Sequence, residues 1–228
     1  MYDINRVSAF IFDMDGTLID SMSHWRRENR KFFERRSLPL PEELQGDIDT
    51  MSSGALVRRF MELYPGAITY QEGMSEYMEC MKVHYDTDIC PKPGALEFLQ
   101  ALKDHGYRMC VATATYKEVA ERALQRIGLL PYLEFVTDNV EVGVHKGDKE
   151  FFLRVADRLN VAPCECVMFE DAPYAMRAAK EAGMQIFAIE EKINLHDEKV
   201  MNAIFKLAQL YVKDFFEAIR KLFPEKSE

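Results

Sequence analysis

The chain has no run that approaches the roughly 18 uninterrupted apolar residues of a membrane-spanning helix. Its amino-terminal residues also lack the pattern of a secretory signal peptide. The five cysteines form no regular framework, and Cys164 and Cys166 have no second pair that would complete a zinc site. These absences lead us to expect a cytoplasmic protein with reduced cysteines and no membrane partner.

Basic residues are in deficit as well, with 29 Lys and Arg against 38 Asp and Glu, a net charge of −9. This deficit disfavours nucleic acid as a partner, because phosphate backbones bind basic surfaces. An anionic substrate would have to be held by local features such as a metal ion, a lysine or helix amino ends. We expect a monomer or weak homodimer that acts on a small molecule.

Five short apolar runs predict buried parallel strands, at residues 7–12, 107–112, 133–136, 166–169 and 185–189. Amphipathic segments separate most of these runs and predict helices at residues 95–104, 117–127, 149–159 and 172–182. This alternation predicts an α/β fold, a doubly wound parallel-sheet (Rossmann-like) core. Ligands of such a sheet bind at the carboxyl ends of its strands.

Residues 21–89 interrupt the alternation, because they have helical periodicity and no convincing strand. We expect helices there at residues 21–35, 42–50, 55–63 and 71–85. The sequence therefore predicts a catalytic core of residues 1–20 and 90–228 with an inserted all-helical cap, which can close over the site as a lid. Apolar residues at helical spacing predict an additional C-terminal helical segment from about residue 197 to 228.

The most informative motif is Asp13-Met14-Asp15-Gly16-Thr17, directly after the first apolar run. In a strand-like backbone, residues i and i+2 point the same way, so Asp13 and Asp15 can face one pocket. One carboxylate can attack phosphorus as a covalent nucleophile while the other handles the proton. Two like charges this close need a cation, and Mg²⁺ takes hard oxygen ligands.

Three further strand-end or loop signals suit the same chemistry. Thr113, with the backbone N–H of Ala114, can bind a phosphoryl oxygen. Lys146 lies in a loop flanked by glycines and can neutralise a transferring group. Lys149 is an alternative, but we prefer Lys146, because Asp148 can cap the next helix and Lys149 would then lie within it. Finally, Glu170 and Asp171 end an apolar strand, where two desolvated carboxylates repel each other unless they bind a cation.

In this order, from about residue 7 to 189, the motifs resemble the haloacid dehalogenase (HAD) superfamily of phosphohydrolases. The helical insert resembles the helical-cap subgroup with the β-phosphoglucomutase and phosphoglycolate phosphatase relatives. The resemblance implies that Asp13 forms an aspartyl-phosphate and that Asp15 protonates the leaving oxygen and then activates water. It also implies that Thr113 and Lys146 hold the phosphoryl group.

The same resemblance implies a Mg²⁺ site. Its ligands would be Asp13, the backbone carbonyl of Asp15, and Asp171, with Glu170 beside or within the coordination shell. Thr17 would support the loop.

In the cap, His24 and Trp25 on the first helix, and Ser52 and Ser53 in a loop, are candidates for substrate specificity. The mutase relatives hold a second phosphate with a basic residue in this loop, which is neutral here, although Arg58 or Arg59 could substitute. We therefore favour a Mg²⁺-dependent phosphatase acting on a small phosphorylated metabolite. A phosphomutase is the alternative, and a non-catalytic binding or regulatory protein on this fold is a third hypothesis.

Overall fold

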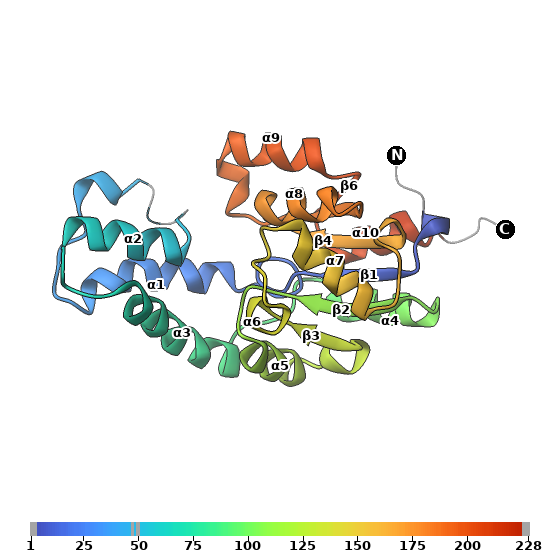
Figure 1. Ribbon diagram of the computed structural model, residues 1–228, viewed down its shortest axis with the longest axis horizontal. Helices are drawn as coiled ribbons and strands as arrows, with labels where there is room; N and C mark the ends of the chain where they lie inside the picture. Colours follow the sequence, from blue (N-terminus) through green and yellow to red (C-terminus); the bar gives the residue numbers. More distant parts are fainter. Residues whose placement is uncertain (1–3, 47, 49–50, 225–228) are drawn as a thin grey trace. The chain divides into compact units, whose positions relative to one another are not determined.

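The computed structural model describes residues 4–46, 48 and 51–224. It divides into two compact units (Figure 1). The first, which we call the core unit, comprises Met1–Asp20 and Cys90–Glu228, and the second, the cap unit, comprises Ser21–Ile89. Each unit has its own secondary structure and its own buried residues.

The core unit contains a six-stranded sheet in the order β3-β2-β1-β4-β5-β6. Every neighbouring pair of strands is parallel. The strands are β1 Ala9–Phe12, β2 Arg108–Ala112, β3 Phe135–Thr137, β4 Cys166–Glu170, β5 Gln185–Ile189 and β6 Leu210–Val212. The strand order changes direction at β1, and in such a sheet the switch point marks the crevice where ligands bind.

Helices connect these strands: α4 Ala95–Asp104, α5 Lys117–Arg126, α6 Asn139–Val142, α7 Lys149–Arg158, α8 Pro173–Glu181, α9 Glu198–Leu207 and α10 Phe215–Leu222. Short 3₁₀ helices occur at Ile4–Arg6, Leu130–Tyr132, Pro163–Glu165 and Asn194–His196. The predicted doubly wound α/β fold is confirmed.

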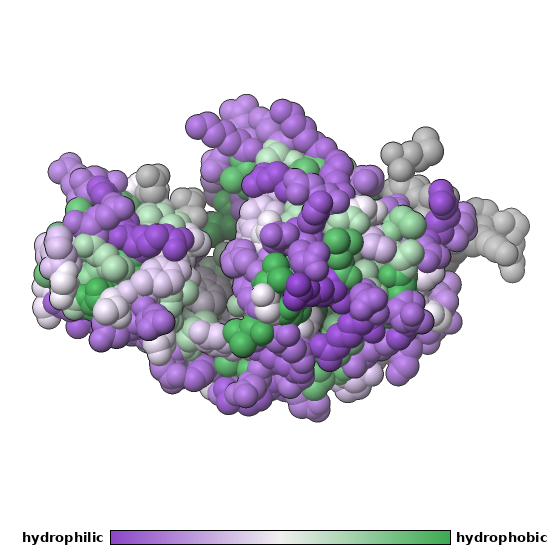
Figure 2. All heavy atoms as spheres, viewed as in Figure 1, coloured by the Kyte–Doolittle hydropathy of each residue, from purple (hydrophilic) through white to green (hydrophobic). Residues whose placement is uncertain are grey.

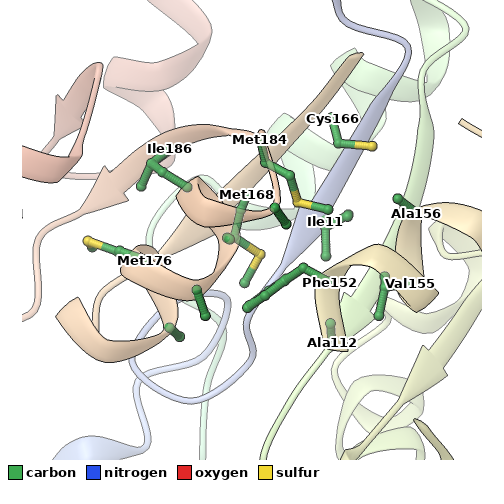
Figure 3. Close-up of a cluster of buried hydrophobic side chains, with 14 of the residues drawn as sticks. Ile11, Ala112, Phe152, Val155, Ala156, Cys166, Met168, Met176, Met184 and Ile186 are labelled. Carbon is green, nitrogen blue, oxygen red and sulfur yellow. The ribbon is translucent and has the colours of Figure 1, made fainter. Parts of the chain in front are cut away.

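One face of the sheet is covered by α7, α8 and α9. Ile11 of β1 and Met168 of β4 are fully buried there with Phe152 of α7 and Met176 of α8 (Figure 3). Successive strand residues point to opposite faces, so these positions alternate with residues that face the other side.

On the opposite face, aromatic rings fill the space between the sheet and helices α4 and α10. Phe12 lies 6.2 Å from Phe98 of α4, measured between ring centroids, and Phe98 lies 5.2 Å from Phe215 of α10. Burial on both faces explains why the sequences of the strands are continuous apolar runs.

The predicted C-terminal helical segment was wrong in one part. Leu210–Val212 forms the edge strand β6 between α9 and α10, and it pairs with β5. The Gln209 side chain also accepts a hydrogen bond from the Ile186 N–H, at 2.7 Å. This pairing joins residues more than 20 positions apart, which helical periodicity within the segment does not reveal.

Within its described residues, the cap unit contains only helices as regular elements: α1 Met22–Glu34, the 3₁₀ helix η2 Glu42–Leu44, α2 Ser53–Leu63 and α3 Tyr70–Thr87. Phe32, Phe60 and Tyr77 lie at the centre of its buried cluster. The helix predicted over residues 42–50 was wrong at its start, where a single 3₁₀ turn follows Pro41 and leads to Gly46. Positions 47, 49 and 50 of that prediction lie outside the described residues.

Hydrophilic residues cover most of the surface visible in Figure 2, and apolar residues form small patches between them. Among the described residues, no helix is long and apolar enough to cross a bilayer.

Candidate active site

Asp13 stands at the carboxyl end of β1, where a tight turn begins. Its backbone N–H donates to the carbonyl oxygen of Phe169 in β4, at 3.0 Å, which keeps the end of β1 beside the end of β4. The turn then closes through Gly16, whose N–H donates to the Ile19 carbonyl oxygen at 3.0 Å and whose φ is +83°. Glycine adopts this left-handed conformation without a steric penalty.

Lys146 is the cation that the fold brings to Asp13. Its side chain is 1% exposed; its Nζ forms an ion pair with Asp13 and lies 2.8 Å from Oε2 of Glu170. Burial alone would lower the pKa of Lys146, but Asp13 and Glu170 raise it well above its ordinary value. The Lys146 backbone is fixed as well, because its N–H donates to Oδ1 of Asn139 at 2.8 Å.

Lys149, the alternative lysine, begins helix α7. Asp148 caps this helix, and its side chain accepts a hydrogen bond from the Glu150 N–H at 2.9 Å. The structure therefore brings Lys146 to the buried carboxylates and places Lys149 in the first turn of a helix.

Three buried carboxylates meet where β1 and β4 end. Single oxygens of Asp13, Glu170 and Asp171 all lie within 4.8 Å of one another. The Oε1 atom of Glu170 accepts hydrogen bonds from the N–H groups of Asp171 and Ala172, at 3.1 and 3.0 Å. Thr17 donates to Oδ1 of Asp171 at 3.2 Å, so the loop after β1 is tied to the end of β4.

This group carries more negative than positive charge, because three carboxylates face one ammonium. Burial, together with the charge of Glu170, raises the pKa of Asp13 to about 7 even though Lys146 acts in the opposite direction. The same two causes raise the pKa of Asp171 well above its ordinary value. A hard divalent cation among these oxygens would relieve the repulsion, so the donor set fits such an ion.

The end of β2 supplies hydroxyl groups. The Thr113 side chain is buried, and its Oγ1 accepts a hydrogen bond from the Thr115 N–H at 3.0 Å. The hydroxyl hydrogen of Thr113 therefore points elsewhere and can donate to a phosphoryl oxygen. Thr115 in turn donates from Oγ1 to Oδ2 of Asp15 at 2.8 Å, and Ala114 between the two threonines is exposed.

The four candidate specificity residues all belong to the cap unit. His24 lies against His84, with ring centroids 4.5 Å apart, and Trp25 stacks 6.4 Å from Tyr77. Ser52 is the N-cap of α2 and accepts a hydrogen bond from the Ala55 N–H at 3.2 Å, and Ser53 is the first residue of that helix. Their contact with a substrate stays a prediction.

The structure adds residues that sequence reasoning missed. Thr115 holds Asp15, and Asn194 donates to the backbone carbonyl of Asp171 at 3.0 Å. Thr115 had a signal, because it stands two positions after Thr113 at the same strand end. Asn194 had none, since its turn follows β5 and only the fold brings it beside β4.

Comparison with known proteins identifies the class. Residues 7–183 match the family of haloacid dehalogenase-like hydrolases, and the chain belongs to this family. It is 31% identical over 185 residues to hexitol phosphatase A of Escherichia coli (strain K12), covering 81% of this chain and 83% of that protein. It is 28% identical over 195 residues to the phosphorylated carbohydrates phosphatase of Thermotoga maritima, covering 82% and 88%.

Among solved structures, the haloacid dehalogenase-like family protein SP0104 of Streptococcus pneumoniae matches with a TM-score of 0.77. The match covers 95% of this chain and 99% of that one at 18% identity, and it shows the fold alone. Together the findings confirm the expected superfamily and the prediction of an enzyme, a phosphoric monoester hydrolase.

Proposed function

We propose that this protein is a Mg²⁺-dependent phosphatase that hydrolyses a small phosphorylated sugar or a related metabolite through an aspartyl-phosphate on Asp13. The observation that carries the proposal is the buried Asp13 carboxylate, which is paired with Lys146 and grouped with Glu170 and Asp171. The relatives support the substrate class, since their names specify hexitol phosphates and phosphorylated carbohydrates.

The first half of the reaction transfers the phosphoryl group to the enzyme. An oxygen of Asp13 attacks phosphorus, the bond to the ester oxygen breaks, and Asp15 gives its proton to the leaving alcohol. Lys146 and Thr113, with the N–H of Ala114, hold the phosphoryl oxygens. In the second half, Asp15 takes a proton from water as the water oxygen attacks phosphorus. The bond between phosphorus and the Asp13 oxygen breaks, which regenerates the Asp13 carboxylate and releases inorganic phosphate.

The buried carboxylates would hold the metal ion. Asp13 and Asp171 are the expected side-chain ligands, with Glu170 beside or within the shell and the backbone carbonyl of Asp15 as a further ligand. When bound, Mg²⁺ supplies positive charge that offsets the carboxylates and the phosphoryl oxygens.

We assign substrate selection to the cap unit, which would act as a lid. The core residues treat any phosphoryl group alike, so discrimination has to come from groups that contact the rest of the molecule. His24, Trp25, Ser52 and Ser53 remain the candidates for these contacts.

Hydrolysis is favoured over phosphomutase activity by the surroundings of Arg59, one of the two arginines that could bind a second phosphate. Arg59 already pairs with Glu43 at 2.6 Å and with Glu62 at 2.7 Å, and the Arg58 guanidinium lies 5.1 Å from the centre of the Tyr70 ring. Binding the second phosphate of a bisphosphate intermediate calls for a positive charge directed at it. The charge of Arg59 is balanced within the cap unit, which supports release of phosphate to water.

The test is an assay of sugar phosphates, polyol phosphates and an aryl phosphate with Mg²⁺, with and without a sugar bisphosphate. Free phosphate and isomerised ester are measured together. We expect phosphate release that needs no activator. Isomerisation that outruns release and needs the bisphosphate would establish the mutase instead. If no ester is turned over, including the aryl phosphate, the result would indicate a non-catalytic binding protein on this fold.

A further inference from the structure

The cap unit contains a second group of potential metal ligands: His24, His84 and Asp88. One ligand atom from each residue lies within 4.8 Å of the other two. The Nδ1 atom of His84 is 3.0 and 3.3 Å from the two Asp88 oxygens, and Nδ1 of His24 is 3.9 Å from Asp88 Oδ2. Among the described residues, this is the group of three that contains imidazoles, whereas the core group contains carboxylates alone.

Two adjacent helices position these side chains. His24 lies in the first turn of α1, His84 lies in the last turn of α3, and Asp88 follows one turn later as the C-cap of α3. Helices α1 and α3 pack against each other within the cap unit (Figure 1). The side chains of His24 and His84 are 12% and 16% exposed and that of Asp88 is 50% exposed, so the group is closed on one side and open to water on the other.

A buried carboxylate stands behind one of the imidazoles. Glu28 Oε1 is 3.7 Å from Nε2 of His84, the ring nitrogen opposite the one that faces Asp88. Glu28 is 3% exposed and accepts hydrogen bonds from Lys31 at 2.9 Å and from Arg35 at 2.7 Å, so it is held as an anion. A carboxylate that faces the distal nitrogen is the usual partner of a metal-binding histidine, because it fixes the ring and its tautomer.

We propose that His24, His84 and Asp88 form a binding site for a late first-row divalent metal ion, with Zn²⁺ as the expected occupant. Two imidazoles and one carboxylate suit Zn²⁺ and its neighbours, whereas Mg²⁺ prefers oxygen ligands alone. Water from the open side completes the coordination. The protein would thus have two chemically different metal sites, one in each unit.

The ligands of this site lie near both ends of the cap unit in the sequence. His24 comes three residues after Ser21, where the cap unit begins, and Asp88 directly precedes its last residue, Ile89. A bound ion would cross-link the start of α1 to the end of α3 and so fix both ends of the insert. Zn²⁺ is therefore expected to stabilise the folded cap unit.

The experiment uses the full chain, freed of metal by a chelator that is then removed. Zn²⁺ is titrated in competition with a chromophoric chelator, and Co²⁺ is used as an optical probe of low coordination number. Asp171→Asn serves as the background, because it weakens the core site without touching the cap. In this background we expect one Zn²⁺ per chain, and an affinity at least about 100-fold lower in Asp88→Asn and His84→Gln.

His196→Gln is the matched control, since His196 is an exposed histidine of the core unit. Circular dichroism establishes that each variant is folded, and Asp88 is exposed enough for its replacement to be tolerated. In the Asp171→Asn background, Zn²⁺ should raise the melting temperature of the chain without a further substitution and of the chain with His196→Gln. It should not raise the melting temperature of the chain with Asp88→Asn. Equal zinc affinity in Asp88→Asn, His84→Gln and His196→Gln, or no zinc bound in the Asp171→Asn background, would overturn the proposal.

Discussion

At the scale of single residues, Asp13 combines burial, an ion pair and two neighbouring carboxylates. We predict that Asp13→Asn lowers kcat by several orders of magnitude, because an amide is a poor nucleophile and a weak metal ligand. Steady-state phosphate release measures the loss, and circular dichroism checks the fold. Asp157→Asn, on the exposed side of α7, should keep its activity. Normal turnover by folded Asp13→Asn would remove the covalent mechanism.

Thr115 is a positioning residue, because it acts through Asp15. Its hydroxyl holds Oδ2 of Asp15 at 2.8 Å, and general acid–base catalysis depends on such alignment. We predict that Thr115→Val lowers kcat about 10- to 100-fold with little change in KM, and that Thr115→Ser restores most of the rate. If the role of Thr115 were purely structural, Thr115→Val and Thr115→Ser would lose equal stability, and serine would not restore kcat.

Much of this site could be predicted from the sequence. Asp13, Asp15, Thr113, Glu170 and Asp171 were chosen as candidates because each lies at or just beyond the end of an apolar run, and the ends of parallel strands meet at one edge of a sheet. Lys146 was preferred over Lys149 because Asp148 can cap the following helix, and the structure has this cap. Asn194 could not be found, since its proximity to Asp171 depends on the path of the chain after β5.

At the scale of elements, Gly94 marks a close approach between α4 and α10. Its φ is +79°, and a Cβ atom there would lie 2.7 Å from the backbone nitrogen of Phe216. Gly106 is the matched control, because its φ is +80° and its surroundings are open. We predict that Gly106→Ala costs about 1 kcal/mol from backbone strain and that Gly94→Ala costs about 1–3 kcal/mol more from overpacking. Chemical denaturation measures both, and equal losses would contradict the close contact.

The second prediction at this scale concerns pH and helix α1. Burial alone would raise the pKa of Glu28, but hydrogen bonds from Lys31 and Arg35 outweigh it, and the pKa lies below its ordinary value of 4.5. Near and below pH 4.5, Glu28 therefore binds a proton more readily in the unfolded chain than in the folded protein. The stability that the Glu28 carboxylate contributes is fully present above this pH. It is lost as pH falls through the folded-state pKa.

Glu28→Gln should accordingly lower the free energy of unfolding by about 1–3 kcal/mol at neutral pH, and the difference from the parent should shrink in acid. Urea denaturation from pH 7 to pH 3, in zinc-free buffer, measures this trend. Glu34→Gln, an exposed position on the same helix, is the control and should show little change. A difference that stays constant down to pH 3 would contradict the anionic role of Glu28.

Some helices could be predicted from the local sequence pattern alone, and one strand could not. Amphipathic helices such as α4 and α7 were predicted to within one residue, because their burial repeats with the helical period. The edge strand Leu210–Val212 was missed, since three residues carry no periodicity and only β5 defines them as a strand. The prediction over residues 42–50 extended a helical pattern through Gly46, a residue that weakens helices.

At the scale of the whole molecule, the two units divide the chemistry between them. The core unit holds the carboxylates and Lys146, and the cap unit holds an imidazole group beside the residues where it joins the core. Because the sheet is buried on both faces, the core has enough apolar contact to stay folded without a metal ion. Metal binding should therefore change its stability without being required for folding.

Metal binding and folding are thermodynamically coupled. A ligand that binds only the folded state stabilises it by RT ln(1 + [L]/Kd), or about 2.7 kcal/mol when its concentration is 100 times Kd. Mg²⁺ should thus raise the melting temperature of the zinc-free parent, and Asp171→Asn should lose both this increase and the activity. Asp157→Asn should keep both. Without metal, Asp171→Asn should melt no lower than the parent, because replacing one of three crowded carboxylates removes repulsion. An equal increase with Mg²⁺ in the parent and in Asp171→Asn would place the metal elsewhere.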